Sequence, residues 1–206
     1  MTHIIRGYNY GAASAGNYAT FEADGTLRLA GNATVFDDLR VEGATARAGV
    51  VAPTDGTGFR GDANHQMRTF LHTQADEIQF YVQFMHGLKT GSVIYPHLHY
   101  MPVTADTGVV KFILGYYWAN IGAQFGTPEV TYELTDTIGA DSRWKHLIAD
   151  NANGLTLTDV GISAVMKCRL YRDNTVGGNL AAAVAGLYFD IHVELDTLGS
   201  REEYTK

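Results

Sequence analysis

The chain has a single cysteine, Cys168, among its 206 residues. One thiol cannot close a disulfide within the chain, so stability has to come from packing, a metal or association of subunits. Apolar runs of the ~18 to 20 residues needed for a membrane span are also missing, and the first residues lack the apolar segment of a secretory signal. We therefore expect a protein that is made and kept soluble inside a cell.

Basic residues are few. The 15 Lys and Arg residues stand against 22 Asp and Glu residues, which gives a formal net charge of -7. A chain of this charge repels phosphate backbones and anionic membrane surfaces. Nucleic acid and membranes are therefore not expected as partners.

Long runs of helical period are absent, whereas the chain contains 23 Gly, 12 Tyr and 9 Phe residues. This balance favours strands joined by tight turns over helices. With 46% hydrophobic residues, a chain of 206 residues can bury one substantial core. The length fits one β-sandwich domain with a short appendage better than two domains.

Apolar residues alternate with polar ones in several segments, which is the pattern of strands with one buried face. The clearest segments are Ile78–Phe84, Val109–Ala119, Ile162–Arg172 and Leu187–Leu195. Weaker candidates are Val35–Val41, Arg47–Val51, His97–Val103, Val130–Leu134 and Trp144–Ile148. Loops are expected at Pro53–Asn64 and Asn174–Asn179. Roughly eight or nine strands predict an all-β, jelly-roll-like antiparallel β-sandwich.

The N-terminal segment, residues 1–33, is rich in Gly, Ala, Asn, Ser and Tyr and poor in aliphatic side chains. Such a segment buries too little apolar surface to order its own backbone. We expect an extended N-terminal arm here, with the sandwich formed by residues 34–206. Tyr8, Tyr10 and Tyr18 are candidate anchors on another protein's surface. A disordered tail in which these tyrosines have no such role fits the composition equally well.

His97 and His99 lie two residues apart on an expected strand and therefore point to the same side, where they can chelate one metal ion. The pair resembles the opening half of the cupin metal motif, but Val103 and Thr104 stand where that motif needs a glutamate. A cupin-like metalloenzyme is therefore the less favoured alternative. Packing or hydrogen bonding at a subunit interface explains paired histidines more often.

His192 is a candidate third metal ligand, because it lies on the polar face of the last expected strand beside Asp190 and Glu194. Nothing in the sequence places this strand next to the one that carries His97 and His99. An ion held on a symmetry axis by several subunits would be structural and not catalytic.

Motifs of nucleophilic catalysis, phosphate binding and dinucleotide binding are missing from the sequence. We therefore expect no enzyme activity, no catalytic residue and no cofactor.

Tyr116, Tyr117 and Trp118, followed by Asn120, form an aromatic string that is a candidate binding or interface surface. Aromatic rings can stack on sugars, but a run of this kind more often contributes to the core on one side and to an interface on the other.

Five segments are considered together, in order along the chain: Gly31–Arg40, Pro96–Pro102, Tyr117–Ile121, Cys168–Asp173 and Phe189–His192. In this order they resemble a family of structural proteins from tailed-bacteriophage virions. The resemblance spans about residues 24–206, and the order of the segments is more specific than any one of them.

This resemblance implies a virion protein, assembled in the host cytoplasm, such as a capsid decoration or head-fibre protein. Its expected partners are the major capsid protein or other virion proteins, and further copies of itself as a homotrimer. The N-terminal arm would bind the shell. A tail-associated receptor- or glycan-binding protein is the alternative.

Overall fold

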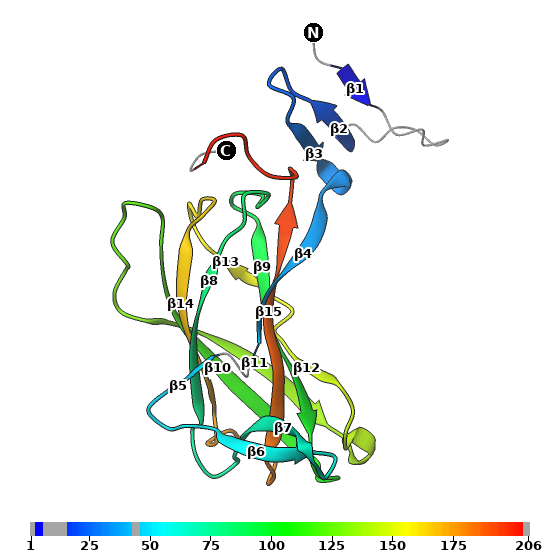
Figure 1. Ribbon diagram of the computed structural model, residues 1–206, viewed down its shortest axis with the longest axis vertical. Coiled ribbons are helices and arrows are strands. Elements are labelled where there is room, and N and C mark those ends of the chain that lie inside the picture. The colour runs from blue at the N-terminus through cyan, green and yellow to red at the C-terminus, as the bar shows by residue number, and fades with distance from the viewer. Residues whose placement is uncertain (1–2, 6–15, 43–45, 204–206) are drawn as a thin grey trace.

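The computed structural model describes residues 3–5, 16–42 and 46–203, and its regular secondary structure is almost entirely strands, which form two packed sheets and a small third sheet (Figure 1). The first sheet has the order β11 (Val130–Ile138), β10 (Gly108–Ala119), β14 (Val165–Arg172), β8 (Glu77–Gln83) and β5 (Arg47–Ala48). Its ladders are antiparallel.

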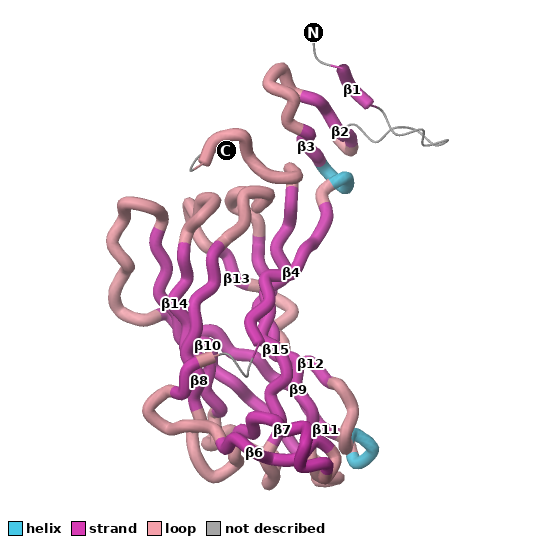
Figure 2. The backbone as a smooth tube through the Cα atoms, in the orientation of Figure 1, coloured by secondary structure: helices cyan, strands magenta, loops and turns pink. Residues whose placement is uncertain are grey.

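The second sheet has the order β12 (Leu147–Ala149), β9 (Val93–Pro102), β15 (Val184–Leu195), β7 (Asp62–Phe70) and β6 (Thr54–Phe59). β13 (Leu155–Thr156) pairs with β9, and β4 (Val35–Glu42) pairs with β15. The prediction of an all-β antiparallel sandwich is confirmed. Helical structure in the described ranges is limited to two 3-10 turns, Gly31–Ala33 and Ala140–Ser142, so no helix there is long enough to span a membrane (Figure 2).

The core lies between the two large sheets and is formed by alternate residues of the central strands. Phe80 of β8, Phe112 and Leu114 of β10, and Phe189 of β15 are buried in one cluster. The ring of Phe112 packs edge-on against that of Phe70 with 5.2 Å between the ring centroids, and the rings of Phe80 and Phe189 have centroids 4.8 Å apart. The alternation read from the sequence therefore assigns the inward faces of these strands correctly.

Cys168 is fully buried in this core, and burial raises the pKa of its thiol. A neutral buried thiol packs as a small apolar side chain.

A β-bulge in β15 sets the orientation of the residues that follow it. The register with β9 shifts between Gly186 and Tyr188. A Cβ atom at Gly186 would lie 2.8 Å from the ring of Phe70, so this position needs glycine. Beyond the bulge, Phe189, Ile191 and Val193 are buried, and the residues that alternate with them lie on the outer face of the sheet.

The prediction of a loop at Pro53–Asn64 is wrong, because this segment contains β6 and the start of β7. The two strands form a hairpin whose turn contains Arg60 and Gly61, both with positive φ. Most side chains of the hairpin are exposed, so the sequence shows no apolar alternation from which strands could be predicted. The loop predicted at Asn174–Asn179 contains no strand in the structure.

The N-terminal segment contains a three-stranded sheet, β1 (His3–Ile5), β2 (Tyr18–Phe21) and β3 (Leu27–Ala30), which projects beyond the sandwich (Figure 1). No residue of β2 or β3 is buried. The backbone N–H of Leu29 donates to the carbonyl of Asp196 at 2.6 Å, and Arg28 forms a bridge with Thr197. This part of the predicted arm is therefore a small sheet that extends the end of β15.

Candidate functional site

Histidine and aspartate side chains gather on the outer face of the second sheet, where β9, β15 and β4 lie side by side. The ladders place Asp190 of β15 opposite His97 of β9 on one side and opposite Arg40 of β4 on the other. Two residues further along β15, on the same face, His192 lies opposite Asp38 of β4. Because alternate residues of these strands are in the core, the outward positions bring these polar groups together.

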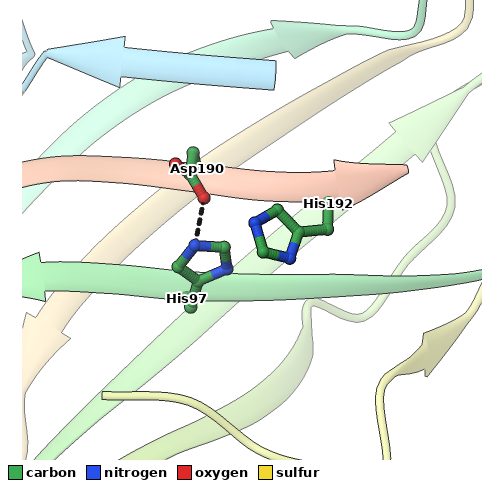
Figure 3. Close-up of side chains that lie close together, drawn as sticks. All are labelled: His97, Asp190 and His192. Atoms are coloured by element: carbon green, nitrogen blue, oxygen red, sulfur yellow. Dashed lines mark ion pairs between the residues drawn. The ribbon is translucent and has the colours of Figure 1, made fainter. Parts of the chain in front are cut away.

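Asp190 is the centre of this cluster. Its side chain is 4% exposed, and Oδ1 is in direct contact with Nε2 of His97, which is also 4% exposed. Nε2 of His99 lies 3.2 Å from Oδ2 of the same carboxylate. Figure 3 shows His97 on β9, opposite Asp190, and His192 two residues beyond Asp190 on β15, with both rings near the carboxylate.

His97 is held in a defined orientation by the backbone. Its Nδ1 donates a hydrogen bond to the carbonyl of Tyr95 at 3.0 Å. A carbonyl only accepts, so the proton of a neutral His97 ring is on Nδ1 and the lone pair is on Nε2. That lone pair faces Asp190 and, at 3.1 Å, Nε2 of His99.

Two further residues extend the cluster. Nε2 of His146, which precedes β12, lies 2.6 Å from Nδ1 of His99. Nε2 of His192 lies 3.1 Å from Oδ1 of Asp38 on β4. Four imidazoles and two carboxylates are therefore connected in one network across four segments of the chain.

Charge and burial shift the pKa values of the central groups in different directions. Burial lowers the pKa of His97, but Asp190 and the Tyr95 carbonyl raise it more, so the net shift is upward. Burial, together with the neighbouring His97 and His146, lowers the pKa of His99. Burial raises the pKa of Asp190, but the histidines around it lower it more, so the group is held as a carboxylate. The cluster thus combines an anionic oxygen donor with at least one neutral imidazole near pH 7.

A groove of about 810 Å³ opens beside the cluster on the same face. His99, His146, Asp190 and His192 line it, as do the aromatic residues Phe59, Trp144 and Tyr188. Its remaining lining residues are Asp38, Arg40, Glu42, Met101 and Leu187. The network is therefore accessible from solvent on one side while its centre, at His97 and Asp190, is buried.

The three histidines singled out from the sequence, His97, His99 and His192, are brought together by the pairing of β9 with β15. His146 and Asp38 were not predicted to belong to the site. His146 lies in the weakly patterned segment Trp144–Ile148, and Asp38 lies in the weakly patterned segment Val35–Val41. Their participation depends on the β12–β9 and β4–β15 pairings, which local sequence does not reveal.

The sequence matches no protein-family model and no curated protein. Among solved structures, CBM35 from Cellvibrio japonicus Abf62 aligns with a TM-score of 0.42 and 12% identity over 80% of this chain and 99% of that one. The Clostridium thermocellum N-terminal endo-1,4-beta-D-xylanase 10B, as CBM22-1-GH10 modules complexed with xylohexaose, aligns with a TM-score of 0.35 and 13% identity. That alignment covers 80% of this chain but 27% of the other. Likeness of this degree carries no argument about function.

The aromatic string on β10 lies on the other sheet, away from the histidine cluster. Tyr116 is 4% exposed, and its ring is part of the core. Tyr117 and Trp118 are partly exposed and line a hollow of about 420 Å³. Asn120 lines the same hollow, but its amide already bonds the backbone of Asp159 and Gly161.

The N-terminal tyrosines are only partly within the described residues. Tyr18 on β2 is 41% exposed and therefore available for contact with another protein. Tyr8 and Tyr10 lie outside the described residues.

Proposed function

We propose that this chain is a non-catalytic structural protein of a tailed-bacteriophage particle, a capsid decoration or head-fibre protein whose N-terminal sheet binds the shell. The observation that supports it is the projecting sheet β1–β3, in which β2 and β3 bury no side chain. The shell is inferred as the partner because five segments, in order along the chain, resemble virion proteins.

β2 and β3 are strands of four residues without a buried face, and such strands contribute little stability of their own. Small sheets are stable in water when a hydrophobic face packs against something else. Tyr18 and Phe21 of β2 are 41% and 42% exposed, and Phe36, at the start of β4, is 61% exposed. A partner surface that covers these side chains would supply the burial that the sandwich does not.

Self-association as a homotrimer is part of the proposal, because the same resemblance to virion proteins implies it. Association stabilises the folded subunit by mass action. The melting temperature should therefore rise with protein concentration, and native mass spectrometry should give three times the subunit mass. A monomer at all concentrations contradicts this part.

Co-sedimentation with purified phage shells tests the partner. The full chain should sediment with shells, and a Tyr18→Ala, Phe21→Ala double variant should bind more weakly. A Phe125→Ala variant is the matched control, because Phe125 is 47% exposed in a loop that leads into β11. Equal binding by the double variant and the control argues against the N-terminal sheet as the shell contact.

A tail-associated glycan-binding protein is the second candidate, favoured by the hollow beside Tyr117 and Trp118. An exposed aromatic face next to hydrogen-bonding groups is suited to a sugar ring. Binding on a glycan array that is abolished by Trp118→Ala would support this function. An array without any bound glycan argues against it.

A further inference from the structure

We propose that His97, His99, Asp190 and His192 bind one divalent transition-metal ion of the zinc class on the outer face of the second sheet. The proposal concerns this cluster alone and does not depend on the particle function. It rests on the orientation of His97, on the spacing of the donor atoms and on the burial of Asp190.

The orientation of His97 is that of a metal ligand. Its Nδ1 is engaged with the carbonyl of Tyr95, which leaves the Nε2 lone pair directed at Asp190. Metal-bound histidines usually donate their other ring N–H to a carbonyl or carboxylate in this way. A lone pair directed at a carboxylate is repulsive unless a cation lies between them or the ring takes a second proton.

The donor atoms have spacings close to those around a single ion. In a tetrahedral zinc site with bonds of about 2.0–2.1 Å, ligand atoms lie roughly 3.4 Å apart. The structure has 3.1 Å between Nε2 of His97 and Nε2 of His99, and 3.2 Å between Nε2 of His99 and Oδ2 of Asp190. Donor atoms of His97, Asp190 and His192 all lie within 4.8 Å of one another. Small side-chain rotations bring this set around one ion.

A bound cation would also stabilise the buried carboxylate of Asp190. Oδ1 is buried and forms no hydrogen bond of normal geometry, although it touches His97. Burial makes this charge costly, and a cation bound between the carboxylate and the imidazoles would lower that cost. Three imidazoles with one carboxylate form a donor set that suits zinc and related ions better than calcium or magnesium.

Two outer residues complete the arrangement. Asp38 lies beside His192, and His146 lies beside His99, so both flanking ligands have a partner that orients the ring. The ion would join β9 to β15 directly and β4 through Asp38. It therefore acts as a structural cross-link within the sheet, with its exposed side toward the groove.

The experiment uses the full chain, purified without a polyhistidine tag and stripped of metal with a chelator. Zinc titration should show one saturable site per chain and a melting temperature that rises until one equivalent is bound. Cobalt should give the visible absorption bands of tetrahedral coordination. Uptake of zinc below one equivalent, with no change in melting temperature, overturns the proposal and leaves His97 and Asp190 as an ion pair.

Variants assign the ligands. His97→Ala and Asp190→Asn should each abolish stoichiometric binding, and circular dichroism should confirm that both remain folded. His65→Ala is the control, because His65 is exposed on β7 and contacts Asp62 outside the cluster. Asp38→Asn should weaken binding by about 10- to 100-fold, as expected for a residue that orients a ligand. Full binding by both His97→Ala and Asp190→Asn would place the ion elsewhere and refute the site.

Discussion

Replacing Arg172 with methionine should strongly destabilise the sandwich without changing its surface. Arg172 is fully buried at the end of β14, and its guanidinium donates to three backbone carbonyls. They belong to Phe70 at 3.0 Å, Leu180 at 2.8 Å and Ala182 at 2.7 Å. Burial lowers the pKa of Arg172 to about 10, so the group is still charged at neutral pH. The side chain thus ties β14 of one sheet to β7 and the segment before β15 of the other.

The magnitude follows from the carbonyls that methionine would leave without a donor. Each buried polar group without a partner costs about 1–3 kcal/mol, and some relaxation or water entry reduces the sum. We expect a loss on the order of 4 kcal/mol in the free energy of unfolding. With a urea m-value of roughly 2 kcal/mol/M, the midpoint of unfolding should fall by about 2 M.

Urea denaturation followed by tryptophan fluorescence measures this change. Arg143→Met is the matched control, because Arg143 is exposed and donates to a single carbonyl, that of Val103, at 3.2 Å. The control should change stability by no more than about 0.5 kcal/mol. If Arg172→Met and the control unfold at the same urea concentration, the bonds of Arg172 do not hold the sheets together.

Two further predictions concern pH and backbone strain. Burial raises the pKa of Glu77, but hydrogen bonds from Gln79 and Arg169 lower it more, so the pKa of Glu77 in the folded protein is depressed. The ionised Glu77 therefore stabilises the fold, and this stabilisation is lost as the pH falls through the depressed pKa. Between about pH 5 and pH 3 the urea midpoint of the wild type should therefore fall more steeply than that of Glu77→Gln, whereas parallel slopes would contradict this. Gly154 has φ +64, and a Cβ there would lie 2.3 Å from Val93, so Gly154→Ala should cost about 1–3 kcal/mol in thermal unfolding. Gly139→Ala, where a Cβ meets nothing within 4 Å, should be tolerated, and equal melting temperatures for the two variants would refute the strain argument.

The fold class and the inward faces of the main strands follow from local sequence because each of these strands buries one face. In β14, Met166, Cys168 and Leu170 are all fully buried, as their alternation predicts. The β6–β7 hairpin could not be predicted in this way. It lies at the edge of its sheet with mostly exposed side chains, so pairing with β15 and a turn at positive φ define it.

The candidate site was predictable only in part. The spacing of His97 and His99 indicates a shared face, and the polar face of β15 indicates His192. These two faces are adjacent because the β9–β15 register sets His97 opposite Asp190. This register is a long-range property of the sheet, and local sequence does not reveal it. Asp190 was recognised beside His192 on the polar face of this strand, but its burial, with 3% of the residue exposed, does not follow from the local sequence.

The connection between the projecting sheet and the sandwich has a mechanical consequence. The chain enters the sandwich at Val35, where β4 begins its eight-residue antiparallel ladder with β15. Tension applied to the N-terminal sheet is directed along β4, nearly perpendicular to the hydrogen bonds of that ladder. These bonds are therefore loaded together in shear instead of opening one after another. The junction should resist pulling far better than the short strands beyond it.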